Sequence, residues 1–179
     1  MIRHAFLLGL VLLSGCASPT PNLFTLAPVP GEVRPGRPAV VQLRQIGLAK
    51  YLDRPQIVLS TEDYRVTLGN NERWGEPLGA MLSRVLAENL RQRLPGAVVF
   101  GEGGAITTEP NAIVEVDVQR LDTDQSGAMV LVAQAARQGG ATRAVRLSVQ
   151  PASSDTADEI GAMSIAVGQL ADAIAGMLR

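Results

Sequence analysis

The chain has 179 residues, of which 46% are hydrophobic, 17 are acidic and 16 are basic. This length is enough for one domain with a substantial core. The nearly balanced charge provides no basic surface of the kind that binds nucleic acid. Only one histidine, His4, and one cysteine, Cys16, are present, and both lie near the N-terminus.

The first fifteen residues have the pattern of a secretory signal peptide. Basic Arg3 and His4 precede nine almost entirely apolar residues, 5–13, which is well short of the roughly 20 that a transmembrane helix needs. Two cleavage sites fit this segment. One is an ordinary cut after Ala17. The other is the sequence Leu-Ser-Gly-Cys at 13–16, which resembles the bacterial lipobox, where the cut precedes the cysteine and its sulfur is acylated. We favour the lipobox because it explains a cysteine that has no disulfide partner.

This interpretation divides the chain into a signal peptide (1–15), a lipidated cysteine with a short tether (16–22) and a single domain (23–179). Lipoproteins of this kind carry several acyl chains, which together anchor a protein stably. The tether reaches about 20 Å at most, so the domain would lie close to its membrane. Alanine rather than aspartate follows Cys16, which in such lipoproteins indicates the outer membrane, on its periplasmic face.

Loss of His4 and acylation of Cys16 would leave the mature chain without a free histidine or thiol. That excludes a Ser-His-Asp triad, a Cys-His pair and the usual zinc sites. Paired carboxylates, a Ser-Lys pair and a carboxylate-bound metal are the alternatives that this leaves. We therefore expect a protein that is not an enzyme and that needs no cofactor and no metal.

The first half of the domain reads as short strands followed by a helix. Alternating apolar residues predict strands at 23–26 and 39–44, and two more within 56–68 around a turn at 61–63. A loop is expected over 69–77. Apolar residues at i, i+3 and i+4 spacing then predict a helix from residue 78 to residue 94, with Pro77 in its first turn and Pro95 ending it.

The second half repeats this order. Strands are predicted at 97–100, 112–121, 128–136 and 143–150. A capping-box pattern at 156–159 opens the last helix, whose apolar stripe we expect to pack on the sheet, with a coiled-coil partner as the alternative. Half-polar strands favour antiparallel pairing. The sequence thus predicts an α+β fold, with a mainly antiparallel sheet and two helices packed on one face.

Two short motifs are weak matches to ligand sites. The segment DTDQSG at 122–127 fits the first six positions of a calcium loop, but position 12 is Ala133 where a glutamate is required. We interpret it as a hairpin turn. The segment GEGG at 101–104 has no following Gly-Lys-Ser/Thr and opens no helix, so we interpret it as a loop.

Trp74 and the segment LAKYLDRPQIV at 48–58 each allow two interpretations. Trp74 is the only tryptophan. It would either anchor the edge of the core or bind a partner, a role in which tryptophan is enriched. Tyr51, Asp53 and Arg54 lie in a predicted loop, where they would either flank a turn fixed by Pro55 or form a contact surface.

Several of these features together resemble the ABC-type transport auxiliary lipoproteins, the PqiC-like family. The family pairs a Tyr-Leu-x-Arg-Pro-x-Ile segment with a Trp-x-Glu-Pro-Leu segment that opens a helix, behind a lipobox. Ala135 departs from the pattern, which has an aromatic residue at that position. The matching residues are Tyr51, Leu52, Arg54, Pro55, Ile57, Trp74, Glu76, Pro77 and Leu78.

The resemblance implies a subunit of a transport system. Such lipoproteins accompany an ABC permease and a protein with mammalian-cell-entry (MCE) domains, and these systems move lipids between membranes and support envelope integrity. A periplasmic lipid-binding carrier is the alternative, and a homo-oligomer stays open. Because loops with a fixed pattern often serve contact, we expect Tyr51, Asp53, Arg54, Trp74 and Glu76 to belong to one partner-binding surface.

Overall fold

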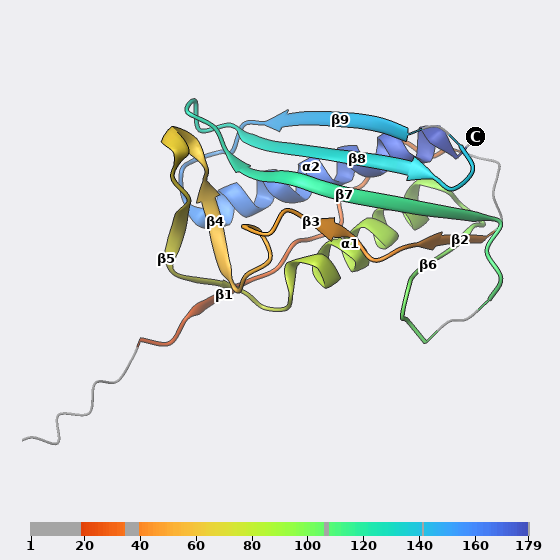
Figure 1. The fold of residues 1–179 in the computed structure, drawn as a ribbon, viewed down its shortest axis with the longest axis horizontal. Coiled ribbons are helices and arrows are strands. Elements are labelled where there is room, and N and C mark those ends of the chain that lie inside the picture. The colour runs from red at the N-terminus through yellow and green to blue at the C-terminus, as the bar shows by residue number, and fades with distance from the viewer. Residues whose placement is uncertain (1–18, 35–39, 106–107, 141, 179) are drawn as a thin grey trace, which may run out of the picture.

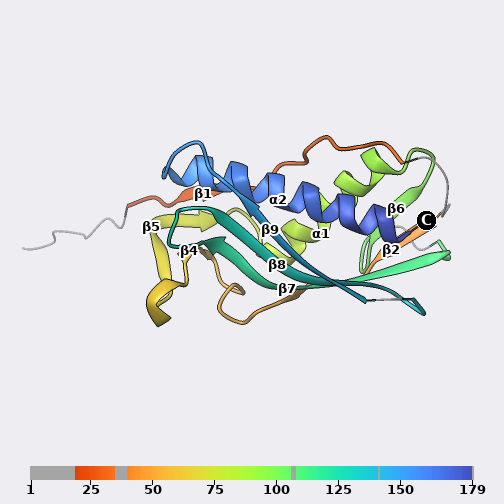
Figure 2. The ribbon, with the colours of Figure 1, turned by 90° about the horizontal axis from the view of Figure 1, so that it is seen from above.

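The computed structural model describes residues 19–34, 40–105, 108–140 and 142–178. A nine-stranded sheet forms one layer in this part of the chain, and two helices cover one of its faces (Figures 1 and 2). The predicted α+β fold, with both helices on the same face, is confirmed. The predicted signal peptide and Cys16 lie outside the described residues.

The antiparallel half of the sheet is built on its longest strand, β7 (Ala112–Thr123). This strand pairs along one side with β8 (Met129–Arg137), which in turn pairs with β9 (Thr142–Val149). The turn between β7 and β8 is the predicted hairpin. The Asp124 Oδ1 atom accepts hydrogen bonds from the Ser126 and Ala128 N–H groups at 2.9 and 3.1 Å, and Gly127 has a φ of 77°.

The other side of β7 pairs in parallel with three short strands that follow one another along it. The sheet is therefore mixed, and the predicted mainly antiparallel pairing of its strands is corrected in this detail. The pairs are parallel because the chain returns, before it enters β7, to the end of the sheet where the first of these strands begins, a crossover that alternation within a strand does not reveal. The three strands are β2 (Val40–Leu43), β3 (Gly47–Leu48) and β4 (Gln56–Ser60).

Three outer strands complete the sheet. Strand β6 (Val98–Gly101) lies beside β2, and β5 (Thr67–Trp74) lies beside β4. The N-terminal strand β1 (Asn22–Phe24) pairs with the last three residues of β5. The loop predicted over 69–77 is wrong for its first six residues, because pairing with β4 and, at its last three residues, with the distant β1 makes them part of strand β5.

The helices place their apolar stripes between the two layers. Helix α1 (Leu78–Arg93) buries Leu78, Met81, Leu82 and Val85. After the helix the chain changes direction at Gly96, whose φ is 85°. Helix α2 (Thr156–Met177) packs on α1, β8 and β9, as the sheet-packing interpretation of its stripe requires. Among the described helices, α2 alone is long and apolar enough to cross a membrane, but most of it is buried inside the domain, as core helices are.

The start of α2 differs from the predicted capping box. The N-cap residue is Asp155, and its side chain makes no capping hydrogen bond. The Thr156 hydroxyl instead donates to Glu72 Oε1 on β5 at 2.9 Å. A tertiary contact with β5 thus replaces the local cap, because the hydroxyl of Thr156 already lies within the first turn.

Candidate functional site

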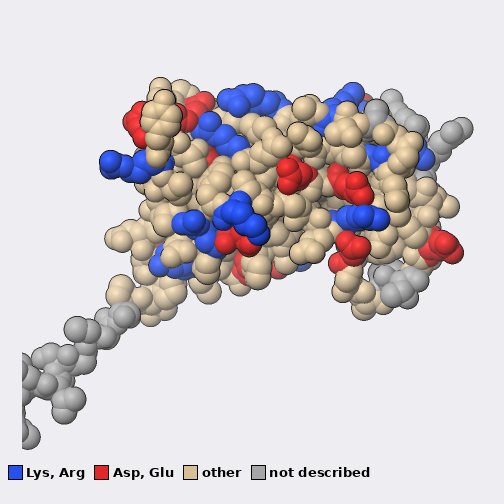
Figure 3. Space-filling view, viewed as in Figure 1, with Lys and Arg blue, Asp and Glu red and all other residues tan. Residues whose placement is uncertain are grey.

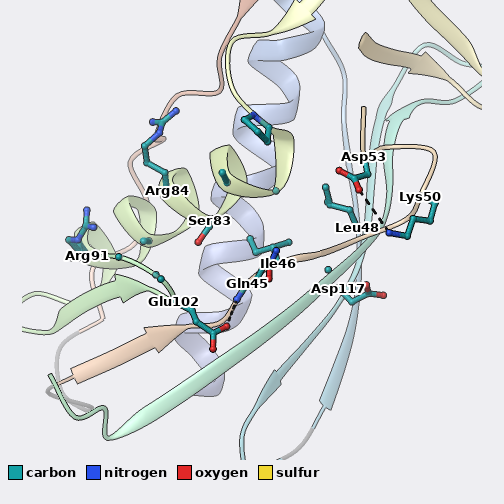
Figure 4. A pocket seen from close by; sticks show the side chains of 18 residues that line it. Gln45, Ile46, Leu48, Lys50, Asp53, Ser83, Arg84, Arg91, Glu102 and Asp117 are labelled. Atoms are coloured by element: carbon teal, nitrogen blue, oxygen red, sulfur yellow. Dashed lines mark hydrogen bonds and ion pairs between the residues drawn. The ribbon is translucent and has the colours of Figure 1, made fainter. Parts of the chain in front are cut away.

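A groove of about 950 Å³ lies between α1, the segment 45–53 and the loop after β6 (Figure 4). Small residues line much of its walls, with Gly79, Ala80 and Ser83 on α1 facing Gly47 and Leu48 on β3. The predicted loop at 101–104 closes one end. The remaining lining residues are Gln45, Ile46, Lys50, Asp53, Pro77, Arg84, Ala87, Arg91, Gly101, Glu102, Gly103, Gly104 and Asp117.

Glycines set the shape of this groove. A Cβ atom at Gly79 would lie 3.5 Å from Leu48 Cδ1 and 3.8 Å from the Ile46 carbonyl oxygen, so α1 begins close against β3 and covers its outer edge. A Cβ atom at Gly47 would lie only 2.6 Å from Asp117 Oδ1. The missing side chain at Gly47 therefore leaves the Asp117 carboxylate room to lie over the strand at the groove's rim.

The charges of the groove are only partly compensated. Each of its three cations has an acidic neighbour: Lys50 lies 4.0 Å from Asp53, while Arg84 pairs with Glu76 and Arg91 with Glu88. The two other carboxylates have no cationic partner in the described part of the chain. Glu102 accepts the Gln45 N–H at 3.1 Å, and Asp117 accepts the Gln119 amide at 3.4 Å. The uncompensated charge of the groove is therefore negative.

The face that Figure 3 shows carries no large patch of one sign among the described residues. Figure 3, from the same side as Figure 1, shows basic and acidic side chains mixed over this face. Within the residues that the structure describes, no three His, Cys, Asp or Glu side chains gather closely enough to hold a metal ion.

The structure brings together the two segments that carry the family resemblance. The Trp74 N–H donates to the Pro55 carbonyl oxygen at 2.8 Å, so that β5 ends beside the loop at 48–55. Asp53 lines the groove. Glu76 lies beside it, where its Oε1 atom accepts a hydrogen bond from Nε of the groove residue Arg84 at 3.1 Å. These two predicted contact residues thus lie at the end of the groove where α1 begins.

Trp74 occupies a different environment. It is only 7% exposed and belongs to the hydrophobic core, as the interpretation of an anchor at the edge of the core describes. Arg54 is half-buried, and its Nε atom has no hydrogen-bond partner in the described part of the chain. A partner-binding role for the five residues stays a prediction.

Tyr51 belongs to a buried polar network at the end of β7. Its hydroxyl donates to Asp122 Oδ2 at 2.9 Å, and the same carboxylate accepts from Thr61 Oγ1 at 3.2 Å and from Arg120 Nε at 2.8 Å. Arg120 also donates to Glu62 Oε1 at 2.7 Å. Burial, reinforced by the charge of Asp122, raises the pKa of Tyr51 far above its ordinary value, so the phenol stays a hydrogen-bond donor.

This network positions the loop at 48–55 and was missed by the sequence analysis. Asp122 is fully buried, yet its place at the start of DTDQSG assigned it to an exposed turn. A carboxylate at the end of a strand gives no local sign of burial, because its partners Tyr51 and Thr61 come from elsewhere in the chain. Both oxygens of Asp122 accept hydrogen bonds, so the network holds the loop at 48–55 against the end of β7.

The fold and the groove define a two-layer α+β domain with an open, charged surface groove. Residues 24–175 match the family described as "ABC-type transport auxiliary lipoprotein component", and the chain belongs to this family. It is accordingly an auxiliary lipoprotein of the PqiC-like type, a component of a transport system associated with a membrane of the cell envelope.

Curated relatives match over a short stretch. The chain is 33% identical over 60 residues to the "Intermembrane transport lipoprotein PqiC" of Escherichia coli strain K12, and equally to that of Shigella flexneri. Each alignment covers 34% of this chain and 32% of the relative, so it spans only about a third of the curated proteins.

Solved structures support the fold over almost the whole chain. An uncharacterized protein is similar at a TM-score of 0.73 and 21% identity, with 90% of this chain and all of the other covered. Protein XCC0632 from Xanthomonas campestris is similar at a TM-score of 0.70 and 16% identity, with 87% and 93% covered. At these identities the likeness shows the fold alone.

Proposed function

We propose that this protein is a non-enzymatic docking subunit of an ABC/MCE-type intermembrane lipid transport system that supports envelope integrity. It is anchored through acylated Cys16 to the outer membrane and faces the periplasm. The single observation that carries the proposal is the family match over residues 24–175, which begins directly after the predicted tether. Strand β1 starts at Asn22, six residues beyond Cys16, so the tether holds the domain within about 20 Å of the membrane.

The groove favours docking over the alternative of a lipid carrier. An acyl chain needs an enclosed and mainly apolar cavity. Ile46 and Leu48 are the only large aliphatic side chains among the groove residues, which include six charged ones. Such a lining suits a polar partner surface better than a hydrocarbon chain. The mammalian-cell-entry protein and the ABC permease are the partners that the proposal names.

The docking role is tested by capture of the partner. The soluble domain, residues 19–179 without the lipid anchor, is expected to retain the purified periplasmic part of the mammalian-cell-entry protein in a pull-down, and an unrelated outer-membrane lipoprotein domain serves as the control. If the two purified proteins show no association at micromolar concentration, the docking role is wrong.

The anchor is tested separately through Cys16→Ser. The hydroxyl does not replace the sulfur nucleophile in acylation, so this variant is expected to lose incorporation of a palmitate analogue and to leave the membrane fraction. Sucrose-gradient separation of the two membranes measures where the wild-type protein resides. Labelling of the serine variant at the wild-type level would contradict acylation at Cys16, and wild-type protein in the inner-membrane fraction would contradict the outer-membrane location.

A further inference from the structure

The dimensions of the groove indicate the form of its occupant. Its walls follow α1 from Gly79 to Arg91, a length of about 18 Å at 1.5 Å per residue. An extended segment of about five residues would span this length.

The lining is suited to close approach by a main chain. Gly47, Gly79 and Gly101 replace side chains along both walls, and Ala80 and Ser83 add little bulk. At Gly47 and Gly101 the space that a Cβ atom would need is already taken by Asp117 Oδ1 at 2.6 Å and Ser83 Oγ at 3.0 Å, so these two glycines keep the walls of the groove compact. A partner with large apolar side chains would find few pockets here, so a chain with small or polar side chains fits better.

The charge of the groove indicates the character of that chain. Lys50, Arg84 and Arg91 are each paired within the protein, and an acidic partner would have to displace those pairs. Glu102 and Asp117 have no cationic partner among the described residues. Figure 4 shows Glu102 at the lower end of the groove and Asp117 on the opposite wall beside β3. Lysine or arginine side chains of a bound segment would form ion pairs with both carboxylates.

We propose that this groove binds an extended, basic segment of the transport partner, with its lysine or arginine side chains at Glu102 and Asp117. The inference rests on the proposed docking function and adds where and through which chemistry the partner is held. Asp53 and Glu76, from the two segments that match the family, stand at the opposite end of the same groove, where they hold Lys50 and Arg84.

The first test fills the groove. Ala80 is exposed on α1 and lines it, so Ala80→Trp is expected to weaken binding of the purified mammalian-cell-entry protein by about tenfold or more through steric exclusion. Gln92→Trp is the matched control, because Gln92 is exposed on the same helix but outside the groove. Wild-type affinity of Ala80→Trp with an unchanged melting temperature would overturn the proposal, as would an equal loss in Gln92→Trp.

The second test removes the charges. Glu102→Gln and Asp117→Asn are each expected to weaken binding about two- to fivefold, the range of exposed ion pairs. The loss should shrink at high ionic strength. Glu109→Gln is the control, since Glu109 is exposed and lies outside the groove. Tighter binding after either neutralisation would contradict a basic occupant.

A third experiment tests whether the groove binds a basic segment, independently of which protein the partner is. A short peptide of alternating lysine and threonine is expected to shift the amide NMR signals of Ser83 and Gly103 in the wild-type domain, but not in Ala80→Trp. The same peptide with glutamate should shift neither. If the mammalian-cell-entry protein fails to bind while the lysine peptide still does, the proposed function is wrong and the groove inference stands. If both peptides or neither shift these signals, the groove inference is wrong.

Discussion

Arg93→Ala is expected to lower the free energy of unfolding by about 3–5 kcal/mol, because it removes a buried guanidinium with four hydrogen bonds, each contributing about 1 kcal/mol. Arg93 is 1% exposed and donates to both oxygens of Asp172 on α2, at 2.6 and 3.1 Å. Its Nη1 atom also donates to the carbonyl oxygens of Val29 and Asn89, at 3.0 and 3.1 Å. One guanidinium thus joins both helices to the strap formed by residues 25–34.

Urea denaturation measures this loss, which corresponds to a fall in melting temperature of about 6–20 °C for a domain of this size. Arg91→Ala is the matched control, because Arg91 lies two residues before Arg93 on the exposed side of α1 and an exposed pair contributes about 1 kcal/mol at most. Arg93→Lys should lose much of the same stability, since an ammonium cannot replace the two-pronged contact. Near wild-type stability of Arg93→Ala would show that the strap and α2 are held by packing alone.

The position of Arg93 shows what the sequence could and could not predict. A basic residue in the last turn of a helix is favoured by the helix dipole, which gives no sign that the side chain of Arg93 is buried. The apolar spacing of α1 and α2 predicted both helices, because local periodicity determines which faces are buried. Nothing local indicated that the strap would cross over Arg93, where a Cβ atom at Gly31 would lie 2.1 Å from its guanidinium.

The same limit applies to the sheet and to the groove. Alternation of apolar residues predicted β7, β8 and β9, whose partners are neighbours in the chain. It did not predict that β5 extends to Trp74, because β1 comes from some 50 residues earlier in the chain. The groove was equally hidden: Asp53 and Glu76 were named from family segments, whereas Glu102 and Asp117 come from a loop and a strand that only the tertiary fold brings together.

Trp74→Ala is expected to destabilise the domain by about 3–5 kcal/mol, as for other large aromatic residues removed from a core. Trp74 is 7% exposed, and its backbone links three segments. It pairs with Phe24 of β1, its N–H donates to Pro55, and the next N–H, of Gly75, donates to the Phe24 carbonyl oxygen at 2.9 Å. Because the Trp74 side chain is buried in the hydrophobic core, loss of the ring leaves a cavity there.

The two roles suggested by the sequence for Trp74 differ in what is lost. A partner-binding tryptophan at the centre of an interface would cost about 2 kcal/mol or more of binding and leave the melting temperature almost unchanged. A core tryptophan would lower the melting temperature and leave the partner affinity of the folded fraction near the wild-type value. Trp74→Phe separates them further, because a phenylalanine retains most of the packing but lacks the indole N–H. From the burial of Trp74 we expect the second outcome, with Trp74→Phe recovering most of the stability. A stable Trp74→Ala domain that no longer binds the partner would contradict it.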